Sequence, residues 1–174
     1  YIFFIAEKNH PEVIGTYGFC NGKCSIIENE EDISIAFDEL MNKEENKILV
    51  VEQTTFRIEK YEKFVKIITK MVEDLNKEKA ENDKKISLEI RRTICNATKI
   101  RQEETLNIAK EVDYMIIIGG KKSSNTRKLY DISAQNCKNA ILIQNALELK
   151  NDFSEELEKI KLLDKIGIMA GAST

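Results

Sequence analysis

Tryptophan is absent from this chain of 174 residues, and proline and histidine occur once each. Long hydrophobic runs are also missing: apolar stretches such as 48–51 and 115–118 are short, whereas a membrane-spanning helix needs about 20 residues. We therefore expect no membrane segment. Four cysteines are too few for a disulfide framework in a domain of this size, which favours a reducing, cytoplasmic setting.

The chain has no excess of positive charge. Lysine and arginine number 27 against 30 aspartates and glutamates, so the formal net charge is −3. A nucleic-acid-binding domain usually carries a basic excess on one face, and we expect no nucleic-acid partner here. With 42% hydrophobic and 33% charged residues, the composition is that of a globular chain rather than a disordered one.

Short apolar runs alternate with segments of helical period. The runs that predict strands are 1–6, 24–28, 47–52, 86–92, 113–119, 140–143 and 165–169. Apolar residues at three- and four-residue intervals predict helices over 33–41, 58–75, 96–110, 126–137 and 154–162. Apolar strands that alternate with helices indicate mainly parallel sheets with helices on both faces, so the expected fold class is α/β.

The length suits two small three-layer αβα domains better than one. The polar run 76–85 reads as the end of a helix and a solvated loop, and a second αβ series starts near Thr93. We therefore expect one domain over 1–92 and another over 93–174. The chain opens on a strand-like run without an initiator methionine and stops just after another such run, so we expect a part of a longer protein.

Small and polar residues follow five of the predicted strands. They form the segments 9–12, 53–55, 95–98, 121–126 and 170–174. Ligands of open α/β sheets bind beyond the carboxyl ends of the strands, which is where these segments lie. We therefore expect them to contribute to a ligand site.

The segment Gly119-Gly-Lys-Lys-Ser-Ser-Asn-Thr126 has two readings. Serine and asparagine at a helix start cap the unpaired backbone N–H groups, and the same N–H groups and the helix dipole can hold a phosphate. The two glycines permit a tight turn and a close backbone approach. The segment does not fit the P-loop pattern GxxxxGK[ST], and simple helix capping stays an open alternative.

His10 and Glu12 flank the only proline. The histidine could contact an anion or carry a proton, and Glu12 could donate a proton if burial raised its pKa. The alternative is an ordinary helix start, with proline in the first turn and an acidic residue near the positive end of the helix.

The cysteines differ in their surroundings. Cys20 and Cys24 are spaced as CxxxC, but no second pair or suitably spaced histidine accompanies them. We interpret these two and Cys137 as incidental thiols. Cys95 follows a predicted strand, where it could be a nucleophile or one ligand of a metal cluster. A single cysteine cannot form a structural zinc site, which needs four ligands.

Five segments together resemble the 4-hydroxy-3-methylbut-2-enyl diphosphate reductase family. They are HPEVIGTYG at 10–18, QTT at 53–55, CNATKIRQ at 95–102, GGKKSSNTRKL at 119–129 and GIMAGAST at 167–174. They follow the family's order at similar spacings across nearly the whole chain. The resemblance implies the last two of three αβ domains around an iron–sulfur cluster, with the first domain and a C-terminal tail outside this chain.

The resemblance also implies roles for individual residues. Cys95 matches the third cysteine ligand of a [4Fe–4S] cluster. Glu12 matches the acid that relays protons to the substrate, and Thr54 matches a threonine beside that acid in the substrate site. The remaining residues that match the family's substrate- and diphosphate-binding group are His10, Thr98, Ser123, Ser124, Asn125 and Ser173.

The implied reaction is a reductive dehydroxylation in the non-mevalonate isoprenoid pathway. Ferredoxin or flavodoxin supplies electrons, Glu12 delivers protons, and the products are isopentenyl and dimethylallyl diphosphate. Because the chain has one of the cluster cysteines, we expect it to be inactive by itself. From the residues alone, a non-enzymatic α/β phosphate-binding module is the alternative. A nucleotide-dependent Rossmann enzyme is disfavoured because GxGxxG is absent.

Overall fold

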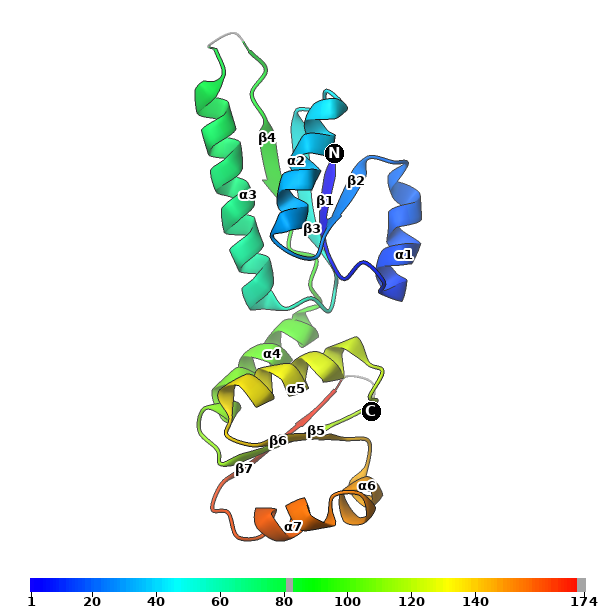
Figure 1. The fold of residues 1–174 in the computed structure, drawn as a ribbon, viewed down its shortest axis with the longest axis vertical. Helices are drawn as coiled ribbons and strands as arrows, with labels where there is room; N and C mark the ends of the chain where they lie inside the picture. Colours follow the sequence, from blue (N-terminus) through cyan, green and yellow to red (C-terminus); the bar gives the residue numbers. More distant parts are fainter. Residues whose placement is uncertain (81–82, 172–174) are drawn as a thin grey trace. The chain divides into compact units, whose positions relative to one another are not determined.

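The computed structural model describes residues 1–80 and 83–171, in which parallel strands alternate with helices (Figure 1). The chain forms two compact units, Tyr1–Ile94 and Cys95–Thr174. Every strand pair in the described ranges is parallel, as the alternating pattern predicts. Within these ranges no helix is both long and apolar enough to cross a membrane.

The first unit contains a four-stranded sheet. Its strands are β1 (Ile2–Ile5), β2 (Cys24–Ile27), β3 (Lys47–Glu52) and β4 (Ser87–Ile90). Its helical segments are α1 (Pro11–Tyr17), the 3-10 turn η1 (Gly18–Cys20), α2 (Glu31–Asn42) and α3 (Ile58–Glu78). The strand order is β2-β1-β3-β4, so β1 and β3 lie side by side in the middle of the sheet.

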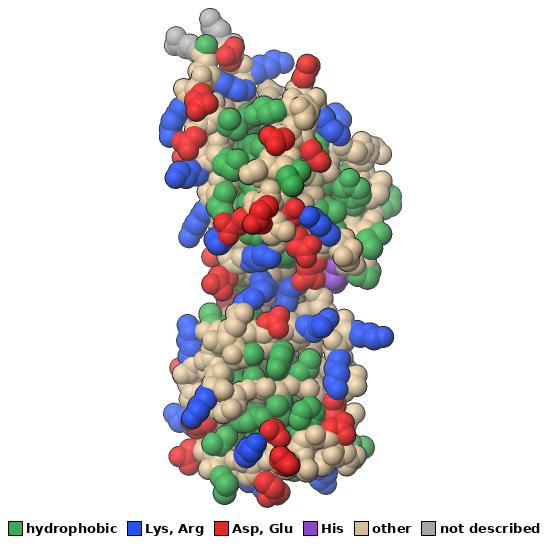
Figure 2. Space-filling view, viewed as in Figure 1, with side chains coloured by type: hydrophobic (Ala, Val, Ile, Leu, Met, Phe, Trp, Pro, Cys, Tyr) green, Lys and Arg blue, Asp and Glu red, His purple; other side chains and the backbone are tan. Residues whose placement is uncertain are grey.

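The two faces of this sheet are covered unequally. Phe3 of β1 packs with apolar residues of α2 and α3 in the larger core. Phe4 points to the opposite face, as pleating requires, and packs there with Val13 of the short helix α1. The exposed apolar side chains of α1 and η1 include Ile14, Tyr17 and Phe19. Figure 2 shows apolar side chains at the surface in this part of the unit.

The second unit is a three-layer arrangement. Its strands are β5 (Tyr114–Ile118), β6 (Ala140–Ile143) and β7 (Ile166–Ala170), in the order β6-β5-β7. Its helices are α4 (Asn96–Ala109), α5 (Ser124–Asn136), α6 (Ala146–Asn151) and α7 (Ser154–Ile160). Met115 and Ile117 face α4 and α5, whereas Tyr114 and Ile116 face α6 and α7. Figure 1 shows the helices on both sides of the sheet.

All seven predicted strands and all five predicted helices are present, with small shifts at their ends. The helix expected from residue 126 starts at Ser124, because Ser123 caps it. Helix α6 was not predicted. It has six residues and none of them is buried, so it carries no apolar periodicity that a pattern could reveal.

Candidate functional site

His10 caps the short helix α1. Its Nδ1 accepts a hydrogen bond from the backbone N–H of Glu12 at 3.2 Å, and Pro11 occupies the first helical turn. The helix-start reading of this segment is therefore confirmed. Because Nδ1 is the acceptor, the proton of a neutral imidazole lies on Nε2, which is then a donor for a ligand.

Glu12 and Thr54 lie together although 42 positions separate them in the chain. Glu12 Oε1 accepts from the Thr54 backbone N–H at 2.9 Å, and Oε2 accepts from the Thr54 hydroxyl at 2.8 Å. They meet because β1 and β3 are parallel neighbours, so the segments that follow them start from the same edge of the sheet. The two hydrogen bonds fix the orientation of the carboxylate.

Gln53 connects the same two segments, a role that the sequence did not reveal. Its side chain is fully buried; Oε1 accepts from the Glu7 N–H at 3.0 Å, and Nε2 donates to Thr55 Oγ1 at 3.0 Å. A glutamine directly after a strand looks like a loop residue in the sequence. In the fold it holds the segment that leads to His10 against the turn that carries Thr54.

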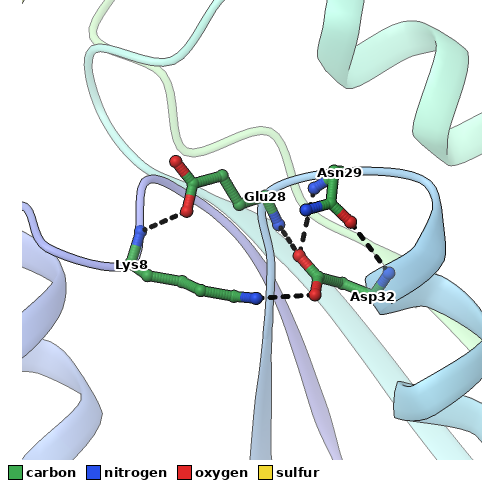
Figure 3. A network of polar contacts seen from close by, with 4 residues as sticks. All are labelled: Lys8, Glu28, Asn29 and Asp32. Carbon is green, nitrogen blue, oxygen red and sulfur yellow. Dashed lines mark hydrogen bonds and ion pairs between the residues drawn. The ribbon is translucent and has the colours of Figure 1, made fainter.

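Lys8 anchors the β1–α1 segment to the start of α2 (Figure 3). Its Nζ lies 2.6 Å from Asp32 Oδ1, and its backbone N–H donates to Glu28 Oε2 at 3.2 Å. Asp32 also accepts from the backbone N–H groups of Glu28 and Asn29. Burial opposes ionisation of Asp32, but Lys8 and these N–H groups outweigh it and lower the pKa of the carboxyl. The segment is thereby held two residues before His10.

Glu52, the last residue of β3, is buried and tied to the segment after β4. Its backbone N–H donates to Thr93 Oγ1 at 2.9 Å, and its Oε1 accepts from the Ile94 N–H at 3.3 Å. Within the described residues its Oε2 is buried without a hydrogen-bond partner. Burial raises the pKa of Glu52, which the Ile94 N–H and the charge of Arg92 oppose only in part.

Cys95 precedes helix α4 and has an exposed side chain. The backbone N–H groups of Thr98 and Ala97 lower the pKa of its thiol, with smaller contributions from the Thr98 hydroxyl and Arg101. Thr98 itself is buried. An accessible thiol with a lowered pKa is suited to bind a metal. The described residues contain no group of three or more His, Cys, Asp or Glu that could hold a metal ion. Cys95 therefore has no set of further protein ligands around it within this part of the chain.

Helix α5 begins at the segment with two readings. Ser123 Oγ accepts from the Thr126 N–H at 3.4 Å, which confirms helix capping. Capping does not account for Asn125, whose side chain is 6% exposed and whose two amide atoms lack partners among the described residues. The Thr126 hydroxyl oxygen is also buried without a hydrogen-bond partner among the described residues. Buried polar atoms without partners are rare in native proteins and indicate a bound ligand or water.

The end of β7 closes against this helix start. The Gly171 N–H donates to the carbonyl of Ile118 at 2.9 Å. A Cβ added at Gly171 would lie 2.1 Å from Thr126 Oγ1, so only glycine fits at this position. The last predicted segment therefore starts directly beside α5. Ser173, the site residue predicted within it, lies outside the described residues.

In the structure the predicted site residues form separate local groups. His10, Glu12 and Thr54 share one edge of the first sheet, and Cys95 contacts Thr98 at the start of α4. The predicted group Ser123–Asn125 starts α5. The fold defines a parallel α/β protein in which polar side chains follow the ends of strands. The chain belongs to the LytB protein family, with a match over residues 1–174.

Curated relatives agree with this membership. The 4-hydroxy-3-methylbut-2-enyl diphosphate reductase of Clostridium tetani is 42% identical over 99% of the chain, and that of Aquifex aeolicus is 38% identical over 100%. The solved E-1-hydroxy-2-methyl-but-2-enyl-4-diphosphate reductase from Plasmodium falciparum is 29% identical over 99% of the chain, with a TM-score of 0.75. The chain spans only 23%, 53% and 48% of these three proteins, respectively.

Proposed function

We propose that the complete protein containing this chain is a 4-hydroxy-3-methylbut-2-enyl diphosphate reductase. The observation that carries the proposal is the Glu12–Thr54 pair: a carboxylate held by two hydrogen bonds at the sheet edge where family membership leads us to expect a proton relay. The products would be isopentenyl and dimethylallyl diphosphate. We assign 1–92 and 93–174 to the second and third αβ domains of that protein, which the two compact units support.

His10 and the start of α5 are the proposed diphosphate-binding groups. The His10 Nε2–H, the hydroxyls of Ser123 and Ser124, and the Asn125 amide would donate to phosphate oxygens, together with Thr98 and Ser173. Hydrogen bonds to a charged group are each worth about 1.5–3 kcal/mol. Holding the diphosphate end restricts the substrate, so that its distal hydroxyl is presented in one orientation.

Glu12 and Thr54 would move the proton. A hydroxyl can both donate and accept a hydrogen bond, so a proton on Glu12 Oε2 can be donated to Thr54 Oγ1 while the threonine hydrogen turns toward the substrate. The existing 2.8 Å contact therefore supports a relay that needs no large movement. Protonation of the departing hydroxyl as water is the step that this pair would assist.

Cys95 fits one ligand position of an iron–sulfur cluster, because its thiol is exposed and its pKa is lowered. A [4Fe–4S] cluster bound in the complete protein would supply the electrons of the reduction, with ferredoxin or flavodoxin as the proposed donor and the cytoplasm as the proposed setting. The other cluster ligands are proposed to lie in the part of the protein beyond this chain.

The test of this function is Glu12→Gln in the complete, anaerobically prepared protein. The amide keeps the size of the side chain but cannot deliver the proton, so we expect substrate binding to persist and turnover to be abolished. Glu31→Gln, an exposed acid in the first turn of α2, is the matched control and should retain turnover. Turnover by Glu12→Gln would remove the relay role, and an inactive wild-type protein carrying its cluster would contradict the reductase assignment.

A further inference from the structure

Lys128 is a buried cation one helical turn after the start of α5. Its side chain is 4% exposed, and its Nζ donates to Ser124 Oγ at 3.0 Å. Helical side chains lean toward the helix N-terminus, which brings the ammonium of a residue in the second turn back over the first turn. The positive charge of Lys128 therefore lies beside the capping segment rather than in solvent.

The other basic residues near this segment are placed differently. Lys121 forms an ion pair with Glu148, and Lys122 and Arg127 are exposed. Among the basic residues between 119 and 128, Lys128 is thus the one that the fold buries. Its position therefore differs from that of a solvent-exposed surface lysine.

The hydrogen bond from Lys128 also determines what Ser124 can do. A serine hydroxyl has one hydrogen and two acceptor positions, and here it accepts from the ammonium. Its own hydrogen is then donated in another direction. In the same helical turn, Asn125 has two buried amide atoms without partners among the described residues, which independently indicates a ligand.

We propose that Lys128 is a positioning residue of the diphosphate site, which orients the Ser124 hydroxyl and adds positive charge to the start of α5. This inference rests on the proposed function and goes beyond the residues that family membership suggests. The partial positive charge of the helix N-terminus and the full charge of Lys128 both favour the same ligand, a molecule with several negative charges on phosphate oxygens.

The experiment compares Lys128→Met and Lys128→Arg with wild type in the complete protein, and Lys138→Met, at an exposed lysine after the end of α5, serves as the control. The dissociation constant of inorganic pyrophosphate is measured at several ionic strengths, together with KM and kcat for the substrate. We expect Lys128→Met to weaken pyrophosphate binding about 10- to 100-fold, to raise KM in parallel and to reduce the salt dependence of binding. Lys128→Arg should recover part of the affinity, and Lys138→Met should resemble wild type.

Two results would overturn the inference while leaving the proposed function in place. One is pyrophosphate affinity and salt dependence in Lys128→Met that equal those of wild type. The other is an equal loss in Lys128→Met and Lys128→Arg with a lowered melting temperature in both, which indicates a structural role only. If the wild-type protein itself neither binds pyrophosphate nor turns over substrate, the proposed function and this inference both fail. If the wild-type protein binds pyrophosphate and Lys128→Met binds it equally well, only this inference fails and the proposed function stands.

Discussion

Two cysteines of this chain acquire opposite properties from the atoms beside them. Cys24 is buried, and burial together with the neighbouring Cys20 thiol raises its pKa. Cys95 is exposed, and the N–H groups of Thr98 and Ala97 lower its pKa. The thiolate is the nucleophilic and metal-binding form of cysteine. At the scale of the residue, the surroundings therefore distinguish two side chains that are chemically the same.

This difference predicts the order of thiol alkylation at neutral pH. Cys95 should react with iodoacetamide first and Cys24 last, because Cys95 is accessible and has the larger thiolate fraction. Peptide mapping by mass spectrometry over a time course measures both rates. Replacement Cys95→Ser should remove the fast phase, and equal rates for Cys24 and Cys95 in the folded chain would contradict the prediction.

At the scale of the secondary-structure elements, a glycine in β7 allows helix α4 and strand β5 to pack closely against it. Gly167 lies in β7, and a Cβ there would come within 2.4 Å of Met115 Sδ and 2.6 Å of Ile108 Cγ2. The absent side chain is what lets α4 pack closely against β5 and β7. A strand that contains glycine is weaker by itself, so here packing outweighs strand propensity.

Gly167→Ala should therefore destabilise the chain by about 1–3 kcal/mol, the usual cost of overpacking a core. Urea unfolding measures the change. Gly15→Ala is the matched control, because Gly15 lies in α1 with nothing within 4 Å of an added Cβ. Alanine should be tolerated there or should stabilise slightly. Equal stability of the two variants would show that the core around Gly167 can expand without cost.

Glu52 connects the end of β3 to the segment after β4, and its raised pKa predicts a pH dependence of stability. The pKa of Glu52 is higher in the folded state than in the unfolded state. Its contribution to the free energy of unfolding is therefore most favourable at a pH below its unfolded-state pKa, and this contribution is lost as the pH rises through its folded-state pKa. Glu52→Gln removes the buried charge, so it should raise the free energy of unfolding at neutral pH by about 1 kcal/mol. The gain should shrink as the pH falls.

Denaturant unfolding across the acidic and neutral range tests this effect. Glu89→Gln is the control, because Glu89 is an exposed acid paired with Arg91. It should change stability little at any pH, as exposed ion pairs usually do. A loss of stability in Glu52→Gln at neutral pH would mean that the carboxylate is needed in its charged form to hold Ile94.

At the scale of the whole molecule, the number of ligands that the chain offers decides whether it can retain an iron–sulfur cluster. The chain spans about half the length of the Aquifex and Plasmodium relatives, and its described residues hold no group that could complete a metal site around Cys95. A cubane cluster is ordinarily held by four ligands, and one thiolate is not enough to retain it. Each unit nevertheless has its own apolar core, so we expect the chain to fold without a cluster.

We therefore expect this chain to carry no stable cluster after anaerobic reconstitution, whereas the complete protein should. Iron and acid-labile sulfide per chain, with the charge-transfer absorption of the cluster, measure the difference. In the complete protein, Cys95→Ser should lower cluster content without unfolding the polypeptide. Full cluster content in that variant would exclude Cys95 as a ligand.

The fold class and most elements follow from local pattern. Strands such as β3 and helices such as α3 are visible because their apolar residues repeat with a fixed period, which needs only neighbours a few positions away. Residue type and position after a strand also made His10, Glu12 and Cys95 candidate site residues. The unequal cover of the first sheet and helix α6 were not visible, because neither has a periodic signal of its own.

By itself, the sequence determined a parallel α/β protein and its resemblance to a reductase family, because periodicity and short motifs are local properties. The resemblance implied that Thr54 lies beside Glu12, but only the tertiary structure showed the two hydrogen bonds between them. It alone also showed that Gln53 and Glu52 connect separate segments and that Lys128 is buried beside Ser124. The first three relations join residues more than 40 positions apart, and the burial of Lys128 depends on the elements that pack around α5. Such relations exist only once parallel strands have brought their ends to a common edge.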